Sequence, residues 1–257
     1  MPDIEFSHEG HVAHVRLNRP ESLNAVTAEM EQLLYEAWQE INDNADIWVA
    51  ILSAEGERAF CAGADVSAAP DGSRGRIAFG GGLTGVGGPL VTLRKPLVAA
   101  VQGHVVGGGF ELAMCADIIV AAQTAKFSMP ETKVGIIGES GIMHRSIRQL
   151  PYRVALAMIL TGERLTADDA LRYGLVNQVV EPDVLLETAN QWTQKLLAAS
   201  PLAVQAAKDA VLSRLGHPLE IALSTRYEPI EAYETSEDRT EGRRAFSEKR
   251  APDWGGR

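Results

Sequence analysis

The sequence is poor in cysteine, with only Cys61 and Cys115 among 257 residues. Two thiols are too few for a disulfide framework, and these two lack the spacing of a metal-ligand pair. The chain also has no apolar run long enough to span a bilayer, and its N-terminal residues contain no apolar stretch typical of a signal peptide. We therefore expect a cytosolic protein of a reducing compartment, with no metal and no membrane partner.

Positive charge is scarce as well. The chain has 24 Lys and Arg against 34 Asp and Glu, which gives a net charge of −10 at pH 7. A nucleic-acid phosphate backbone would have to bind against this unfavourable field, so the composition argues against a nucleic-acid partner. Hydrophobic residues make up 46% of the chain, enough to fill a sizeable core, and nothing in the composition indicates disorder.

The order of apolar patterns predicts an α/β fold with largely parallel strands, because strand patterns alternate with helix patterns. Alternating residues on both sides of Glu9-Gly10 indicate a hairpin, and Thr27 precedes a helical stripe from Met30 to Ile41. The predicted elements are a hairpin over 3–17, a helix capped by Thr27, strands over 47–54, 96–101 and 117–122, and a helix that starts at the glycines 107–109. The strand-like pattern of 96–101 continues to residue 106, directly before that helix.

Strand patterns stop after about Val180. Thr166-Ala-Asp-Asp169 has the form of a capping box, and Ser200-Pro201 indicates a further helix with the next apolar stripe. That stripe consists of Val204, Ala207, Val211 and Leu215. We expect a core over residues 1–195 that carries the site, followed by a helical region over 196–257 of a kind that often packs against a neighbouring subunit.

Residues 70–89 form the one shift in composition inside the core, since they are rich in glycine. Residues 80–85 match the dinucleotide pattern G-x-G-x-x-G literally. That pattern binds a dinucleotide only where it joins a strand to a helix, and no strong strand precedes it here. The stretch is predicted to be a substrate-side loop or lid, without a nicotinamide or flavin cofactor.

Three consecutive glycines, Gly107 to Gly109, stand at the predicted helix start, and Glu111 follows them in an apolar run. A glycine can present its backbone N–H to a ligand without a Cβ in the way. The carboxylate of Glu111 is expected in a partly dry environment. The alternative is that Glu111 only complements the helix dipole, which is worth about 0.3–1 kcal/mol.

Two further stretches strengthen the case for a reactive site. Residues 59–66 (AFCAGADV) offer a second loop of small residues, and residues 127–136 (FSMPETKVGI) present Glu131 from a loop after Pro130. A lone glutamate in such a place is commonly a solvated surface residue. Together, two backbone donors and two carboxylates suit chemistry at a carbonyl, because the donors stabilise an oxyanion and the carboxylates move protons.

These three stretches, in this order and at this spacing, resemble the enoyl-CoA hydratase/isomerase (crotonase) superfamily. Similarity extends over nearly the whole chain, since residues 17–25, 160–180 and 241–254 also resemble the family's segments. The resemblance implies an α/β fold: a crotonase-like spiral of repeated ββα units, followed by C-terminal helices that build a homotrimer or a hexamer of two trimers.

The resemblance also implies the site and its reaction. The amides of Ala64 and Gly108 would form the oxyanion hole for the thioester carbonyl, and Glu111 and Glu131 would be the two catalytic glutamates. The substrate-binding residues carried over are Ala62, Ala64, Asp65, Val66, Ser67, Gly107, Gly108 and Glu139. The implied activity is reversible addition of water to a 2-enoyl-CoA. Coenzyme A is then part of the substrate, and no cofactor is implied.

One position departs from the hydratase pattern. Glu139 stands where a small glycine commonly helps to hold water, and an acidic residue before Ser-Gly is similar to carnitinyl-CoA dehydratases, whose substrate is cationic. The alternative is that Glu139 is an exposed substitution without a role.

Double-bond isomerisation and a non-catalytic or RNA-binding role also remain open as functions of the chain. Arg19 is the candidate for the CoA entrance, and His144 and Arg145 are expected on a helix surface.

Overall fold

The computed structural model describes residues 2–65, 91–138 and 141–257. The predicted lid over 70–89, with its glycine pattern at 80–85, lies outside the described residues. The same holds for three of the substrate-binding residues implied by the resemblance, Val66, Ser67 and Glu139.

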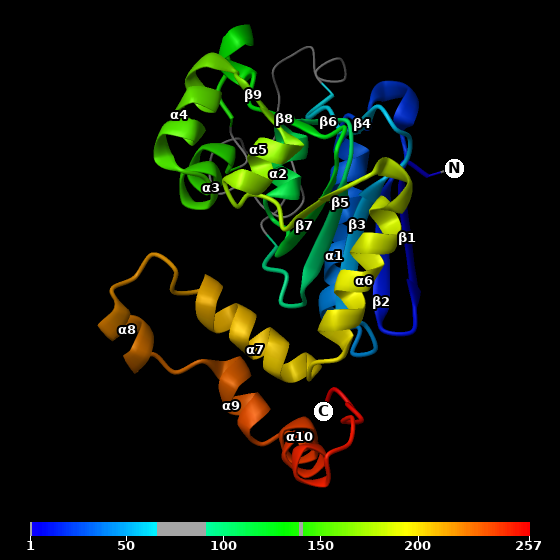
Figure 1. Ribbon diagram of the computed structural model, residues 1–257, viewed down its shortest axis with the longest axis vertical. Helices are drawn as coiled ribbons and strands as arrows, with labels where there is room; N and C mark the ends of the chain where they lie inside the picture. Colours follow the sequence, from blue (N-terminus) through cyan, green and yellow to red (C-terminus); the bar gives the residue numbers. More distant parts are fainter. Residues whose placement is uncertain (1, 66–90, 139–140) are drawn as a thin grey trace.

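The larger sheet has the strand order β1-β2-β3-β5-β7-β10. Its strands are β1 (Ile4–Glu9), β2 (Val12–Leu17), β3 (Val49–Ala54), β5 (Leu97–Val101), β7 (Ile118–Ala122) and β10 (Gln178–Val180). The hairpin β1–β2 is antiparallel and every other pairing is parallel (Figure 1). The predicted hairpin and the largely parallel packing are thus confirmed.

The smaller sheet has the order β4-β6-β8-β9. It contains β4 (Ala59–Cys61), β6 (His104–Val106), β8 (Lys126–Ser128) and β9 (Arg164–Thr166), of which β9 alone pairs antiparallel. Each of β3, β5 and β7 is followed along the chain by a strand of this second sheet. The chain therefore winds as repeated two-strand turns, with α2 (Gly108–Ala113) between the second turn and the third, which confirms the predicted spiral.

The strand predicted over 96–101 is confirmed as β5, whereas the strand-like pattern that continues to residue 106 divides between β5 and β6, in two sheets. The break lies at Gln102 and Gly103. The Gln102 side-chain amide donates to the carbonyls of Ala54 and Gly56 at 2.9 and 2.7 Å. Gly103 has φ +56°, and a Cβ there would press on the Arg58 backbone and lie 2.8 Å from the Glu57 carbonyl oxygen. Only glycine allows the chain to turn into the second sheet here.

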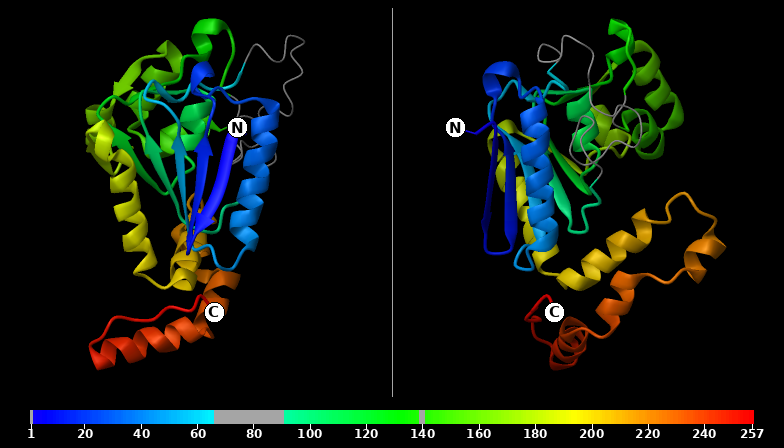
Figure 2. Two further views of the ribbon diagram at one scale, coloured as in Figure 1. Left: turned by 90° about the vertical axis from the view of Figure 1, so that its right-hand side faces the viewer. Right: turned by 180° about the vertical axis from the view of Figure 1, so that it is seen from behind.

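Two helices cover opposite faces of the larger sheet (Figure 2). In α1 (Ala28–Asp43) the Thr27 hydroxyl accepts the Met30 N–H, and the predicted stripe is buried. Alternate residues of β3 divide between two cores: Ala50 and Leu52 pack with the α1 stripe, while Val49 and Ile51 pack with α6 (Leu185–Leu197). Both faces are apolar because a parallel sheet in this fold is covered on both sides.

Shorter helices surround the smaller sheet. They are α2 (Gly108–Ala113), α3 (Ile142–Gln149), α4 (Tyr152–Thr161) and α5 (Ala167–Arg172), with 3-10 turns η1 (Pro20–Ser22), η2 (Glu131–Val134) and η3 (Pro182–Val184). The predicted capping box starts α5, since the Thr166 hydroxyl accepts the Asp169 N–H and donates to its carboxylate.

The C-terminal arm, residues 201–257, extends away from both sheets (Figures 1 and 2). It contains α7 (Pro201–Leu212), α8 (Leu219–Ser224), α9 (Glu228–Glu234) and α10 (Glu237–Glu248). The Ser200 cap of α7 is confirmed. The apolar stripe predicted on this helix is not buried within the chain: Val211 is 59% and Leu215 63% exposed, and the helix ends before Leu215. The boundary at 195/196 stays a prediction, because α6 continues across it.

Two polar contacts fasten the arm. Lys208 of α7 forms a 2.6 Å ion pair with Asp117, the residue before β7. In α10 the buried carboxylate of Asp238 accepts the Ser200 hydroxyl and the Gly255 N–H, both at 2.9 Å. Buried charge needs such donors. Within the described ranges, no helix is long and apolar enough to cross a membrane.

Candidate active site

Three parallel strands of the smaller sheet end at one edge, and a predicted motif follows each. Residues 62–65 follow β4, Gly107 follows β6 and residues 129–131 follow β8. The Gly107 N–H donates to the Ser128 carbonyl at 3.0 Å, which joins the second turn to the third. Ligands in sheets of this type bind beyond the carboxyl ends of the strands. The structure therefore brings together the three stretches that the sequence singled out.

The backbone N–H of Ala64 points away from Val26, the residue with which its loop pairs. Residues flanking Ala64 pair with Val26: the Val26 N–H donates to Gly63, and the Asp65 N–H donates to Val26, at 2.8 and 2.9 Å. The amide of Ala64 then faces the opposite side. Gly108 is the first residue of α2, where a helix leaves N–H groups without an intrahelical acceptor. Among hydrogen bonds between described residues, neither amide has an acceptor.

These two amides belong to loops in close contact. A Cβ placed on Gly63 would lie 3.2 Å from the Val106 carbonyl oxygen and 3.4 Å from the Gly108 nitrogen. Gly63 also has φ +99°, a conformation that favours glycine. The close approach of the backbones sets two available donors side by side, which is the arrangement that an oxyanion hole requires.

The glycine run 107–109 is explained by separate constraints. Gly107 has φ +53°, and a Cβ there would lie 2.9 Å from Glu131 Oε1. At Gly109 a Cβ would lie 2.5 Å from the Cys61 Cβ, and it would press harder still on the Cys61 carbonyl oxygen. Gly108 begins the helix that carries Glu111. Glycine at 107 leaves room for a glutamate, and glycine at 109 lets α2 lie directly on β4.

Glu111 lies in the first turn of α2 and is 3% exposed. One of its carboxylate oxygens, Oε1, accepts the backbone N–H of Ile142 at the start of α3. The dry environment predicted for this residue is confirmed. The hydrogen bond fixes the Glu111 carboxylate against the start of α3.

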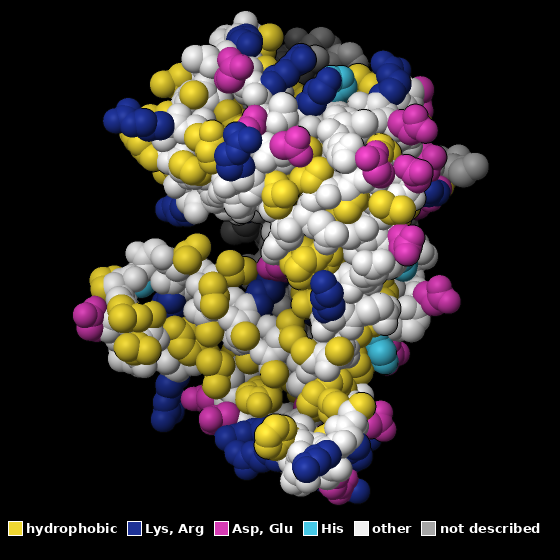
Figure 3. All heavy atoms as spheres, in the orientation of Figure 1, with side chains coloured by type: hydrophobic (Ala, Val, Ile, Leu, Met, Phe, Trp, Pro, Cys, Tyr) yellow, Lys and Arg dark blue, Asp and Glu magenta, His cyan; other side chains and the backbone are white. Residues whose placement is uncertain are grey.

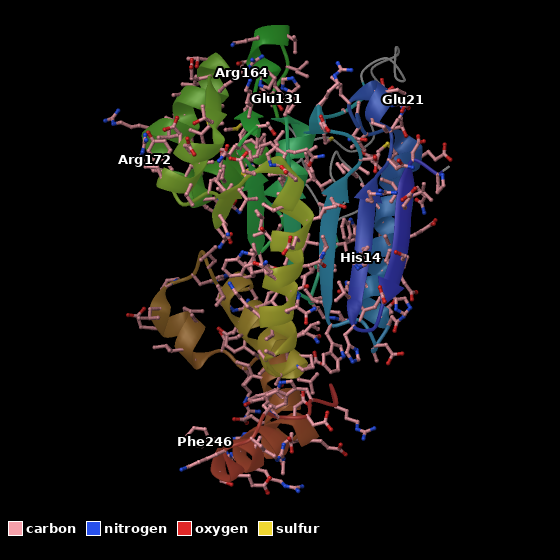
Figure 4. All side chains as sticks on the ribbon, turned by 45° about the vertical axis from the view of Figure 1, so that its right-hand side comes forward. His14, Glu21, Glu131, Arg164, Arg172 and Phe246 are labelled. Atoms are coloured by element: carbon pink, nitrogen blue, oxygen red, sulfur yellow. The ribbon has the colours of Figure 1, made fainter. Side chains whose placement is uncertain are left out.

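Glu131 opens the 3-10 turn η2, so it lies in a short helix and not in the predicted loop. Besides its approach to Gly107, its Oε1 lies 3.8 Å from the position of a Cβ on Gly138. Ile142, whose amide binds Glu111, packs its side chain against the same Gly138. The two glutamates thus share neighbours. Figure 4 shows Glu131 at the end of the smaller sheet, remote from the arm where Phe246 is labelled.

Burial raises the pKa of Glu131 above its ordinary value, and a hydrogen bond from its own backbone N–H opposes part of that shift. Desolvation penalises the charged carboxylate, so the group holds its proton to a higher pH than a glutamate in water. A raised pKa favours the protonated carboxyl group, which is the form that can act as a general acid.

Replacement of Glu131 by Gln is expected to stabilise the fold at pH 7. Because the pKa of Glu131 is raised by folding, the folded protein binds this proton more tightly than the unfolded chain does. The stability that the proton contributes is therefore lost as pH rises from the pKa of the unfolded chain, 4.5, through the higher pKa of the folded protein. The free energy of unfolding in urea should therefore be higher for Glu131→Gln at pH 7, with no gain at about pH 4. An equal gain at both pH values would rule out the ionisation as the cause.

The other residues predicted for the site or its entrance bind neighbouring protein groups. The Arg19 guanidinium, expected at a CoA entrance, donates to the Asp65 carboxylate at 2.6 Å. Both side chains are thereby engaged with each other. The Ala62 N–H donates to the Leu23 carbonyl at 3.0 Å, which holds the loop after β4. Arg145, expected on the surface, is half-buried, whereas His144 is exposed.

Sequence reasoning did not identify Gly63, Gly138 and Ile142 as site positions. Gly63 lies inside the AFCAGADV stretch, so a glycine among small residues was a usable signal. No local signal marks Ile142, because its contribution is a backbone N–H that reaches Glu111 only after folding. Within the described part of the chain, no group of His, Cys, Asp or Glu could hold a metal ion.

Comparison with known proteins identifies similar sequences of almost equal length. The profile of the family described as enoyl-CoA hydratase/isomerase matches residues 7–257. The (E)-benzylidenesuccinyl-CoA hydratase of Thauera aromatica is 38% identical, with 98% of either chain covered. The carnitinyl-CoA dehydratase of Salmonella typhi is 39% identical over 99% of this chain and 98% of its own.

Solved structures agree over the full length. One from Novosphingobium aromaticivorans, described as a candidate short chain enoyl-CoA hydratase, has a TM-score of 0.93 and 66% identity, with 100% of this chain and 99% of the other covered. The enoyl-CoA hydratase structure from Mycobacterium marinum has a TM-score of 0.91 and 34% identity, with both chains covered completely.

Proposed function

Because the chain belongs to the enoyl-CoA hydratase/isomerase family, the crotonase superfamily, and its members act on acyl-CoA thioesters, we propose that it hydrates 2-enoyl-CoA to 3-hydroxyacyl-CoA. The observation that carries this proposal is the pair of amides at Ala64 and Gly108 beside two buried or half-buried glutamates. Isomerisation needs one group to carry a proton between carbons, whereas addition of water uses a base and an acid. Two retained carboxyl groups therefore favour hydration.

The amides polarise the thioester. In the proposed complex the N–H groups of Ala64 and Gly108 donate to the thioester carbonyl oxygen, which gains negative charge when water adds to C3 and an enolate forms. Fixed donors at the developing charge typically contribute about 2.7–4 kcal/mol each to the barrier reduction. No metal is needed for this step.

The glutamates divide the proton transfers. Glu111, whose carboxylate accepts the Ile142 N–H, takes a proton from the water that attacks C3. Glu131, whose pKa is raised by burial, delivers its proton to C2 of the enolate. One water is consumed, one C–O and one C–H bond form, and the C2–C3 π bond is lost. Solvent then restores both protonation states, and the reverse sequence is dehydration.

The proposal is tested by mixing the purified protein with crotonyl-CoA and following the absorbance of the conjugated enoyl thioester. We expect rapid loss of absorbance and formation of 3-hydroxybutyryl-CoA, identified by mass. Retained absorbance, with the protein folded and binding acyl-CoA, would contradict hydration of simple enoyl-CoA substrates.

A second candidate is dehydration or hydration of a specialised acyl-CoA. It is favoured by the 38–39% identity to relatives named (E)-benzylidenesuccinyl-CoA hydratase and carnitinyl-CoA dehydratase. The mass of the product separates hydration from isomerisation: an isomerase shifts the double bond without a change in mass, whereas a hydratase adds the mass of one water.

An RNA-binding role would require retardation of RNA in a gel, which the net charge of −10 disfavours.

We further propose that the arm joins copies of this chain in a trimer or hexamer. Its exposed apolar residues support this, since Val211, Leu212, Leu215, Leu219 and Leu223 are each more than half exposed. In Figure 3 hydrophobic side chains gather over α7 and α8. Sedimentation velocity would show a monomer if the proposal is wrong.

The proposed location is the cytosol, in keeping with two free cysteines, and cell fractionation checks it.

A further inference from the structure

One segment, residues 18–26 between β2 and α1, contacts the loop that carries the Ala64 amide. Three backbone hydrogen bonds join it to residues 62–65, at 2.8, 2.9 and 3.0 Å, and two of them flank Ala64. Figure 4 labels Glu21 of this segment at the same end of the molecule as Glu131. The position of this proposed oxyanion donor therefore depends on how firmly the segment is held.

A buried asparagine fastens the segment to the core. Asn24 is fully buried, and its side-chain amide donates to the carbonyls of Glu55 and Ala59, each at 3.0 Å. Its side-chain oxygen accepts the Arg19 N–H at 2.8 Å. Asn24 also has φ +54°, a left-handed conformation in which asparagine is enriched. The asparagine thus fixes the backbone from which the Arg19 side chain extends.

The Arg19 side chain completes the connection to the loop. Its Nη1 donates to the Asp65 carboxylate at 2.6 Å and to the Ala25 carbonyl at 3.2 Å. The arginine and aspartate side chains are only 23% and 12% exposed, so water and salt screen this ion pair less than a surface pair. Asp65 follows Ala64 directly, and its own N–H donates to the segment. Both the side chain and the backbone of Asp65 are therefore held in place.

The ion pair also has an electrostatic consequence. A carboxylate next to an oxyanion hole opposes the negative charge that develops on the thioester oxygen. Arg19 supplies a compensating positive charge within hydrogen-bonding distance of Asp65. Removal of the arginine alone should therefore harm the site more than removal of both charges.

We propose that Arg19 is a positioning residue: through its ion pair with Asp65, it holds the Ala64 amide in the orientation that binds the thioester oxygen. The inference rests on the proposed function, because it takes Ala64 to be an oxyanion donor. A phosphate of coenzyme A is the alternative partner for the arginine. A phosphate would compete with Asp65 for the guanidinium, so removal of the aspartate would strengthen phosphate binding but weaken the positioning of the amide.

The polarisation of a bound thioester measures the oxyanion donors directly. The ligand is para-dimethylaminocinnamoyl-CoA, in which an electron-donating amine is conjugated with the thioester carbonyl. Hydrogen bonds to the carbonyl oxygen draw charge along this chromophore and move its absorbance to longer wavelength. With the intact protein at saturation, we expect a red shift in the wild type that is smaller in Arg19→Gln and in Asp65→Asn.

Turnover of crotonyl-CoA is the second measurement. Arg19→Gln should lower kcat by about 10–100-fold, because a donor displaced by about 1 Å can cost about 100-fold in rate. The Kd of saturated butyryl-CoA should change by less than about threefold. The double variant Arg19→Gln/Asp65→Asn, which has no uncompensated carboxylate, should recover part of the red shift and part of kcat.

Two further variants control for the fold and for loss of an ion pair. Arg19→Lys keeps the charge, so it should retain more of the red shift than Arg19→Gln, and it supplies the test if Arg19→Gln unfolds. The matched control is Arg16→Gln. Arg16 forms an ion pair of the same 2.6 Å length with Glu55, and its side chain also binds Glu5, outside the loop. This variant should keep the wild-type red shift and kcat.

Three results would overturn the inference. The first is an unchanged red shift in both Arg19→Gln and Asp65→Asn. The second is a lower affinity for free coenzyme A in Arg19→Gln with a higher one in Asp65→Asn, which would assign the arginine to a phosphate. The third is binding to the wild type without a red shift, since no donor would then need positioning.

Failure of the proposed function gives a different result. The wild-type protein would then shift the absorbance of the bound chromophore but would not hydrate crotonyl-CoA. The red shift in the Arg19 and Asp65 variants would still test the ion pair.

Discussion

Glu111→Gln and Glu131→Gln are each expected to lower kcat for hydration of crotonyl-CoA by about 10²–10⁴-fold. Glutamine keeps the size of the side chain but can neither accept the proton of water nor deliver one to C2. Because the oxyanion donors are backbone amides that neither substitution removes, affinity for saturated butyryl-CoA should change little. Both quantities come from steady-state rates and from equilibrium binding of the saturated ester.

The double variant sharpens this prediction. If the glutamates act as one unit, removing both should reduce kcat little further than removing one, since residues of a catalytic unit are not additive. Glu163→Gln is the matched control, because Glu163 is exposed and lies outside the site. Loss of binding together with turnover would show that the glutamates are structural, and full activity in either variant would remove that residue from the mechanism.

Gly109→Ala is expected to reduce both stability and activity. The added methyl group would lie 2.5 Å from the Cys61 Cβ and closer to the Cys61 carbonyl oxygen, so α2 must move away from β4. Overpacking of this kind typically destabilises by about 1–3 kcal/mol. The displacement also carries the Gly108 amide and Glu111 out of place, and a shift of about 1 Å can lower a rate about 100-fold.

Two controls locate the cause of that effect. Gly216→Ala should be neutral, because a Cβ at Gly216 meets nothing within 4 Å. Cys61→Ala combined with Gly109→Ala removes the thiol but leaves the carbonyl oxygen and Cβ in the way, so we expect no rescue. Urea unfolding and crotonyl-CoA turnover measure the two effects. Normal turnover in Gly109→Ala would mean that α2 tolerates the displacement, against the tight fit described above.

Much of the fold was predictable because it is encoded in local patterns. The Glu9-Gly10 hairpin, the Thr27 cap and the stripe of α1 each depend on residues within one or two turns of one another. The same applies to Ser200 at the start of α7. The stripe on that helix was also visible, yet periodicity shows only that a face is apolar and not what covers it, and α7 leaves Val211 exposed.

The candidate site was predictable only as a set of residue types. Two glutamates and two small-residue loops could be selected because their chemistry suits a carbonyl, and similarity to a family gave them roles. The pairing of Arg19 with Asp65 was not predictable, because a sequence records that opposite charges exist and not which of them meet.

By itself the sequence determined the elements, the order in which strands and helices alternate, and the groups able to donate a hydrogen bond or move a proton. Tertiary structure alone decided that residues 96–106 divide between two sheets, that Gly63 contacts Gly108, and that the Ile142 amide reaches Glu111. The physical reason is the separation along the chain over which each kind of interaction acts. Periodicity and capping act over a few residues, whereas the site is assembled by backbones and side chains that are distant along the chain and meet only when the strands of the spiral are stacked.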